Sequence, residues 1–200
     1  MGVPTAIDYA AQRNGCWLQL SAAACSRWRG PTARPTGSLW IDPLVLASVM
    51  PQSFHFVAAE VLQHQALNGF VLRRLGHQFI ERYEREHGVA DIDRLADVVR
   101  AGQSLVIFPE GRLARAPGLR PFHMGAFVVA AETGVPAVPV AIRGTRTILR
   151  PEQHFPRRGA IDIVIGEPIR PTGADWAAAV ELQHAARDAV LRLSGEPDVE

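Results

Sequence analysis

The sequence predicts an α/β domain with a largely parallel central sheet flanked by helices. From Asp42 onward, short apolar segments alternate with helical segments of roughly ten residues, which is the pattern of strands joined by helical connections. The segment Ser104–Phe108 is an apolar run, as expected for a strand buried on both faces of a sheet. The chain has 200 residues, which is enough for one core of this kind.

The first predicted element begins at Asp42. Asp is a favourable N-cap and Pro43 fits the first helical position, so a short helix is expected over the apolar residues that follow. Later helices are marked by apolar residues at helical spacing and by terminal glycines, and they are expected at residues 67–75, 91–101, 125–133 and 174–193. Strands are expected at residues 54–58, 77–81, 104–108, 136–142 and 161–165.

The N-terminal segment differs from the rest of the chain. Residues 1–41 hold three of the four Trp, both Cys and a single acidic residue, and their Pro- and Gly-containing stretch has neither helical nor strand periodicity. We expect 1–41 to be irregular, either disordered or not native to the fold. Residues 42–193 are then the domain, and 194–200 a C-terminal tail. Two cysteines without metal-ligand companions are typical of free thiols in a reducing cytoplasm.

The charge balance excludes several function classes. The chain has 21 basic and 20 acidic residues, which argues against electrostatic nucleic-acid binding. Every basic residue is Arg, so a catalytic lysine is excluded. The histidines show no metal-ligand spacing, and no metal site is expected. No apolar run reaches the length of about 18 residues that spans a membrane, and the N-terminus does not resemble a secretory signal.

One loop gathers chemically active side chains. It follows the strand that ends at Phe108 and contains Glu110, several Arg residues and His123 before the helix at 125–133. Between residues 110 and 150 the chain has six Arg and two Glu. Arg side chains and free backbone N–H groups suit a phosphate, although a solvated loop whose Arg residues pair with distant acids has the same composition.

Three segments carry motifs, in the order Gly76–Arg82, Phe108-Pro109-Glu110-Gly111 and Val138–Ile142. They resemble the second, third and fourth motifs of the phospholipid and glycerol acyltransferases, which include the 1-acylglycerol-3-phosphate acyltransferases. The resemblance covers Ser38 to Leu193 and implies a glycerolipid acyltransferase-like fold.

The resemblance also implies site residues. Those expected to bind the phosphate of the acyl acceptor are Arg82, Phe108, Pro109, Glu110, Gly111 and Arg115. Val138 and Pro139 would line a groove for the acyl chain or the acceptor. Without the resemblance, Glu110 could equally cap the loop against neighbouring Arg side chains.

The first motif of the family is incomplete in this chain. A hydroxyl that attacks a thioester needs a general base, and the family supplies a His oriented by an Asp five positions later. The Asp is present as Asp42, the expected catalytic residue, but the His position holds Gly37 and the preceding position holds Thr36. The alternative for Asp42 without its partner is a role as the N-cap of the following helix. His123 is the candidate for a replacement base, or for a contact with the acceptor phosphate.

The resemblance implies transfer of a fatty acyl group from acyl-CoA or an acyl-carrier protein to a lysophospholipid or glycerol phosphate, in phospholipid biosynthesis. No cofactor is expected to be bound. We expect a cytoplasmic protein that contacts the inner face of the membrane peripherally, with no nucleic-acid partner. Three alternatives fit the residues: an inactive relative that retains lipid or phosphate binding, an N-terminally damaged copy from a frame error in a GC-rich gene, and a small α/β domain whose Arg-rich loop docks an acidic partner.

Overall fold

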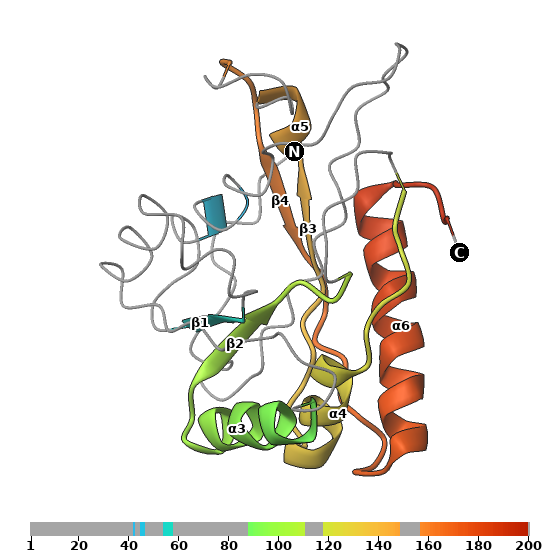
Figure 1. Cartoon of the computed structure of the whole chain (residues 1–200). Helices are drawn as coiled ribbons and strands as arrows, with labels where there is room; N and C mark the ends of the chain where they lie inside the picture. The colour runs from blue at the N-terminus through green and yellow to red at the C-terminus, as the bar shows by residue number, and fades with distance from the viewer. Residues whose placement is uncertain are drawn as a thin grey trace.

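The computed structural model describes residues 42, 45–46, 54–57, 88–110, 118–148 and 157–199. Its elements follow in the order β1 (Phe54–Val57), α3 (Gly88–Arg100), β2 (Ser104–Ile107), α4 (Gly125–Thr133), β3 (Val140–Arg143), α5 (Thr145–Ile148), β4 (Asp162–Ile165) and α6 (Trp176–Ser194) (Figure 1). Asp42, Val45 and Leu46 also have helical backbone. The helix predicted at 67–75 and the strand predicted at 77–81 lie outside the described residues.

The described strands form two pairs. β1 and β2 are parallel, in a register that places Phe54 opposite Ser104, and this confirms the parallel pairing expected of strands joined through helices. β3 and β4 are antiparallel, with Val140 opposite Ile165. The alternation of strands and helices favoured parallel pairing, and this second pair departs from it. The described helix between β3 and β4 is α5 (Thr145–Ile148), which has only four residues, whereas a parallel crossover usually contains a longer helix.

Regular pairing in β3 starts later than the sequence predicts. The predicted strand 136–142 contains Pro136 and Pro139, which have no N–H to donate to a strand ladder. Ala137, between them, makes an isolated antiparallel bridge with Ile169, and the continuous strand begins at Val140. The two prolines therefore explain why only the second half of the predicted strand forms a continuous ladder.

The helices agree closely with their predicted ranges. α4 has the predicted bounds, and Gly134 ends it in the left-handed conformation at φ 68°. α3 begins three residues before the predicted start, at Gly88. α6 was predicted to begin at Ala174 and begins two residues later, at Trp176. Asp175 is its N-cap and accepts a hydrogen bond from the backbone N–H of Ala178 at 2.8 Å. The short helix α5 was not predicted.

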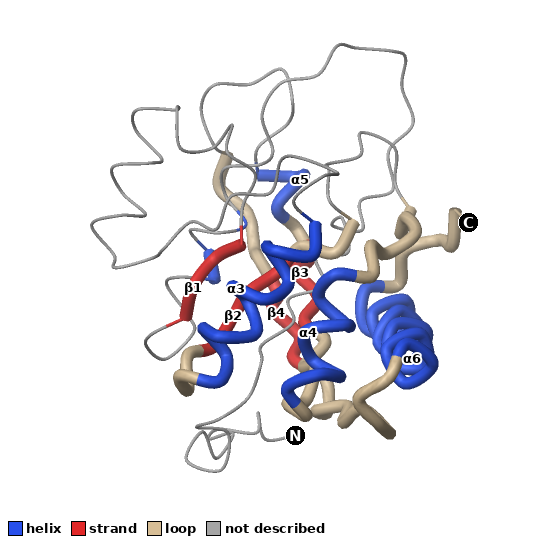
Figure 2. The backbone as a smooth tube through the Cα atoms, turned by 60° about the horizontal axis from the view of Figure 1, so that its bottom comes forward, coloured by secondary structure: helices blue, strands red, loops and turns tan. Residues whose placement is uncertain are grey.

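A first apolar core joins three helices to β2. α4 lies between α3 and α6 and packs against both (Figure 2). Phe127 of α4 is fully buried there, and its ring stacks with that of Phe122 at a centroid distance of 6.2 Å.

Among the described residues, no helix is long and apolar enough to cross a membrane.

A second apolar cluster joins the strands to the segment that holds Asp42. Its fully or almost fully buried members are Leu46, Phe56, Val106, Val138, Val140 and Ile142. Phe108 and three isoleucines at 161, 163 and 165 pack against it. This second cluster therefore connects residues from both strand pairs with the short helical segment near the start of the domain.

Replacement of Phe127 by Ala tests the first core. Phe127 is fully buried, so the Phe127→Ala variant loses apolar contacts and leaves a cavity. We expect the free energy of unfolding to fall by about 3–5 kcal/mol, measured by denaturant titration. Trp176→Ala is the control, because Trp176 is 63% exposed; a loss of similar size in this control would contradict the assignment of the core.

Candidate functional site

The candidate site begins where β2 ends. Phe108, Pro109 and Glu110 follow the last residue of β2 directly, and Pro109 is buried while Phe108 and Glu110 are half-buried. β1 ends alongside, because Val57 is paired with Ile107. Residues beyond the carboxyl ends of parallel strands are where α/β domains bind ligands, so these side chains lie where a site is expected.

Phe108 is positioned by an aromatic contact with β1. Its ring stacks on that of Phe56, with the centroids 6.5 Å apart and the ring planes at 16°. Phe56 is almost fully buried in the second cluster, so it cannot shift without disturbing the strands around it. The stack fixes the first residue of the predicted phosphate-binding motif against the core.

Asp42 is tied to the same cluster through Leu46. Asp42 is only 8% exposed, and Leu46, one helical turn later on the same face, is fully buried among the strands. Asp42 has helical backbone, whereas the prediction made it the non-helical cap. The catalytic role of Asp42 stays a prediction.

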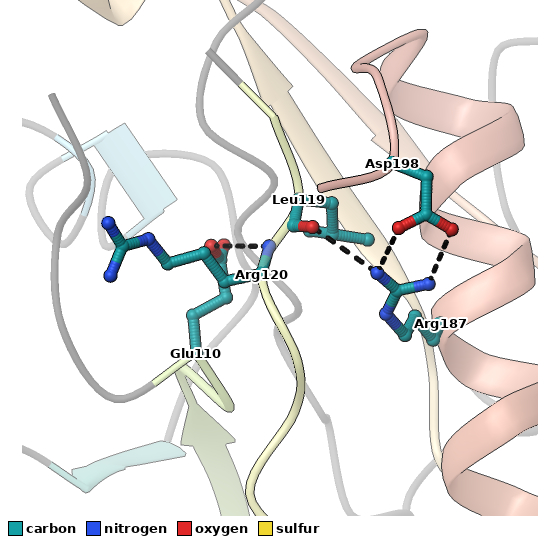
Figure 3. A network of polar contacts seen from close by, with 5 residues as sticks. All are labelled: Glu110, Leu119, Arg120, Arg187 and Asp198. Atoms are coloured by element: carbon teal, nitrogen blue, oxygen red, sulfur yellow. Dashed lines mark hydrogen bonds and ion pairs between the residues drawn. The ribbon is translucent and has the colours of Figure 1, made fainter. Parts of the chain in front are cut away.

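Two hydrogen bonds join the end of β2 to the segment that precedes α4. The N–H of Arg120 donates to Oε2 of Glu110 at 3.3 Å, and the N–H of His123 donates to the carbonyl oxygen of Pro109 at 2.8 Å. Figure 3 shows the Glu110 side chain directed at the backbone of Arg120. Glu110 therefore links the end of β2 to the segment that precedes α4.

Arg120 is the basic side chain beside Glu110. Its guanidinium extends from the 119–120 backbone to the side away from α6 (Figure 3), and it makes no hydrogen bond or ion pair with any residue that the structure describes. Leu119, the preceding residue, is fully buried on the other side. Sequence reasoning counted Arg120 among the loop arginines but did not select it, because only the fold places it next to Glu110.

Arg143, another of the arginines between residues 110 and 150, has a structural role. Arg143, at the end of β3, donates from a terminal guanidinium nitrogen to the backbone carbonyl of Leu193 in the last turn of α6. A cation at this position interacts favourably with the negative end of the helix dipole, and it binds a carbonyl group that has no partner within the helix. Of the six arginines between residues 110 and 150, Arg143 therefore contacts α6, through a backbone carbonyl group and not through a distant acid.

The two predicted groove residues are buried. Val138 is 2% exposed and belongs to the second cluster, and Pro139 accepts a hydrogen bond from the N–H of Gly166 at 2.8 Å. Their role in a groove stays a prediction. The remaining predicted site residues, Arg82, Gly111 and Arg115, lie outside the described residues, as does Gly37.

Sequence reasoning missed four polar residues near the site. Gln183 and Arg187, one turn apart on α6, donate to the carbonyl groups of Phe122 and Leu119, both at 3.3 Å. The other two residues, Glu196 and Asp198, lie beyond α6. Glu196 accepts a hydrogen bond from the N–H of Gly118, and Asp198 forms an ion pair with Arg187. The available signal was a pair of long polar side chains on the apolar face of α6, where Gln183 and Arg187 are buried.

The sequence model of the family described as Acyltransferase matches residues 38–143. The chain belongs to the acyltransferase family. The match begins at Ser38 and includes Asp42 and the segment 108–111, so it supports the resemblance on the residues that carried it.

Individual relatives agree with the family. This acyltransferase is 30% identical over 137 residues to 1-acyl-sn-glycerol-3-phosphate acyltransferase BAT2 of Brassica napus, an alignment that covers 68% of this chain and 40% of that protein. It is 33% identical over 173 residues to lyso-ornithine lipid O-acyltransferase of Pseudomonas aeruginosa, covering 78% of this chain and 65% of that protein. The chain thus spans between 40% and 65% of the length of these two relatives.

The fold matches a solved acyltransferase. The crystal structure of the 1-acyl-sn-glycerophosphate acyltransferase PlsC from Thermotoga maritima superposes with a TM-score of 0.64 at 21% sequence identity. The superposition covers 90% of this chain and 66% of that one. The predicted α/β class and acyltransferase-like fold are confirmed.

Removal of the Glu110 carboxylate tests the contact at the centre of the site. In Glu110→Ala the N–H of Arg120 loses its partner, and a hydrogen bond of this kind contributes roughly 1 kcal/mol. We expect the amide hydrogen exchange of Arg120 to become about five to ten times faster, measured by mass spectrometry or NMR.

The amide of His123 is the internal control, because its partner is a backbone carbonyl that the substitution leaves in place. Equal acceleration at both amides would mean that the whole segment has loosened, and unchanged exchange at Arg120 would contradict the contact with Glu110.

Proposed function

We propose that this acyltransferase moves a fatty acyl group from a thioester donor to the free hydroxyl of a lysolipid with an anionic head group. Family membership supports the reaction class. The observation that carries the acceptor assignment is the contact between Glu110 and the backbone of Arg120, beyond the carboxyl end of β2. The donor is proposed to be acyl-CoA or an acyl-carrier protein.

The acceptor head group is proposed to bind beside Glu110 through Arg120. The backbone N–H of Arg120 donates to Glu110, and the guanidinium of Arg120 makes no hydrogen bond or ion pair with a residue that the structure describes. We propose that this guanidinium binds the ligand. A guanidinium binds phosphate or carboxylate with two parallel hydrogen bonds, so it suits either a lysophosphatidate or the carboxylate of a lyso-ornithine lipid. Arg82 and Arg115 would add to this site in the manner that the family resemblance implies.

The reaction needs a base that position 37 does not provide. The acceptor hydroxyl is a weak nucleophile at neutral pH until a base removes its proton. With Gly37 in the place of the family His, we propose that this chain accelerates transfer only by binding and orienting its two substrates. Asp42 stands where the family resemblance places the orienting Asp, and we propose that it would orient an imidazole supplied at position 37.

The site of action is proposed to be the membrane surface. Lysolipid acceptors are held in bilayers, so an enzyme that uses them must reach the interface. We propose peripheral contact at the inner face of the membrane, where a thioester donor made in the cytoplasm is available.

Restoring the family His tests the reaction class. In Gly37→His a general base is placed five residues before Asp42, and general-base catalysis contributes about 10²–10⁴-fold. We expect the rate of acyl-CoA consumption in the presence of lysophosphatidate to rise by at least 10²-fold. The measurement is the release of the CoA thiol.

Two further variants make this test specific. Gly37→Gln adds a polar side chain of similar size without a base and should give no such increase. The double variant Gly37→His, Asp42→Asn should lose most of the gain, because the imidazole is no longer oriented or charge-stabilised. Activity of the original chain equal to that of Gly37→His would show that another base operates. No thiol release from any variant, with lysophosphatidate still bound, would favour the inactive binding relative.

Neutralisation of Arg120 tests the acceptor site. In Arg120→Gln one charge-assisted contact to the head group is lost, and such contacts are worth about 1.5–3 kcal/mol. We expect the Kd for a short-chain lysophosphatidate to rise by roughly 10- to 100-fold, measured by isothermal titration calorimetry.

Arg94→Gln is the matched control, because Arg94 is an exposed arginine on α3. A parallel titration with lyso-ornithine lipid shows which head group the site prefers. An equal affinity for lysophosphatidate in Arg120→Gln and Arg94→Gln would contradict the proposed role of Arg120.

A further inference from the structure

The residues after α6 pair with the segment that leads into α4. The N–H of Gly118 donates to Oε2 of the buried Glu196 at 2.7 Å, and the N–H of Leu119 donates to the carbonyl oxygen of Pro197 at 2.9 Å. Val199 returns a hydrogen bond to the carbonyl oxygen of Leu119 at 3.4 Å. Residues 196–199, which belong to the predicted C-terminal tail 194–200, thus lie alongside Leu119, and Asp198 makes an isolated parallel bridge with Leu119.

A buried arginine strengthens this pairing. Arg187 of α6 is 4% exposed and holds both carboxylate oxygens of Asp198, at 2.9 and 2.5 Å. The same guanidinium donates to the carbonyl oxygen of Leu119 at 3.3 Å (Figure 3). A buried charge is tolerated only when it is paired, so Arg187 depends on Asp198 and holds it against α6. Arg187 therefore bridges α6, the tail and Leu119.

Gly118 allows the close approach of the tail. Its φ is 125°, a conformation that other residues rarely adopt, and a Cβ there would collide with the side chain of Val199. The same Cβ would lie 3.2 Å from the carbonyl oxygen of Pro197. The glycine and the tail are therefore fitted to each other, which a loosely attached terminus would not require.

The contacts of the tail lead to the site in one step. Leu119 is held by Pro197, Val199 and Arg187, and the next residue, Arg120, donates its N–H to Glu110. The link to Glu110 is long, at 3.3 Å, so a small displacement of Leu119 is enough to break it. The same displacement would redirect the Arg120 guanidinium.

We propose that residues 196–199 position the acceptor site, and that Arg187 and Asp198 are its positioning residues. The tail clamps Leu119 so that the Arg120 N–H meets Glu110 and the Arg120 guanidinium faces the anionic head group of the acceptor. We call the contacts of residues 196–199 and Arg187 with Leu119 the clamp. This inference rests on the proposed function, because the residues that the tail holds in place are those of the proposed acceptor site. It predicts that affinity for the acceptor depends on residues that the acceptor does not touch.

The test uses the full chain and two independent readouts. Asp198→Asn weakens the ion pair from the half-exposed side, and Asp188→Asn, an exposed acid on the same helix as Arg187, is the matched control. The readouts are the amide exchange rate of Arg120 and the Kd for a short-chain lysophosphatidate. We expect Asp198→Asn to raise both at least fivefold, with amide exchange in α3 unchanged, and Asp188→Asn to raise neither.

A second variant approaches the clamp from the other side. Gly118→Ala keeps every charged residue but pushes Val199 away, and it should reproduce the two increases. If Asp198→Asn raises exchange equally in α3 and at Arg120, the tail only stabilises the domain and the inference is overturned.

Unchanged exchange and affinity in both variants, with the original chain binding lysophosphatidate, would overturn the inference and leave the proposed function intact. If the original chain binds neither lysophosphatidate nor lyso-ornithine lipid, the proposed function fails, and the inference fails with it whatever the exchange rates show.

Discussion

The buried contact among β1, β2, β3 and the segment of Leu46 is the constraint on which the site depends. Residues of the site are attached to this contact: Asp42 lies one turn before Leu46, and Phe108 stacks on Phe56 of β1. Close packing lets none of these side chains shift alone. The second apolar cluster thus serves as a rigid scaffold, because it fixes the positions from which the polar side chains of the site extend.

A second constraint acts on the polar half of the site. The segment before α4 has an apolar side, which Leu119 and Phe122 turn toward the first core, and a polar side that carries Arg120. α6 and the residues after it satisfy the backbone groups of this segment, through Gln183, Arg187 and the tail. Buried polar groups are costly unless they are paired, so this pairing gives the segment one preferred position. An arginine carried by such a segment is better oriented than one on a free loop.

The sequence predicted the regular elements well because their patterns are local. The apolar run at β2 and the terminal glycine of α4 each determine an element without reference to the rest of the chain. The antiparallel pairing of β3 with β4 was not predicted, because it depends on how a connection returns. The same limit applies to the site. The segment at Phe108–Glu110 was found by its motif, whereas Arg120, Arg187 and Asp198 act through contacts between residues far apart in sequence.

We propose that an anionic acceptor binds beyond the carboxyl end of β2, beside Glu110 and on the guanidinium of Arg120. A crystal structure of the chain with bound glycerol 3-phosphate tests it most directly. The account predicts a phosphate at hydrogen-bond distance, about 2.7–3.2 Å, from the guanidinium of Arg120, with the Glu110 contact to the Arg120 N–H intact. A phosphate bound at another face of the domain, with Arg120 directed elsewhere, would contradict it.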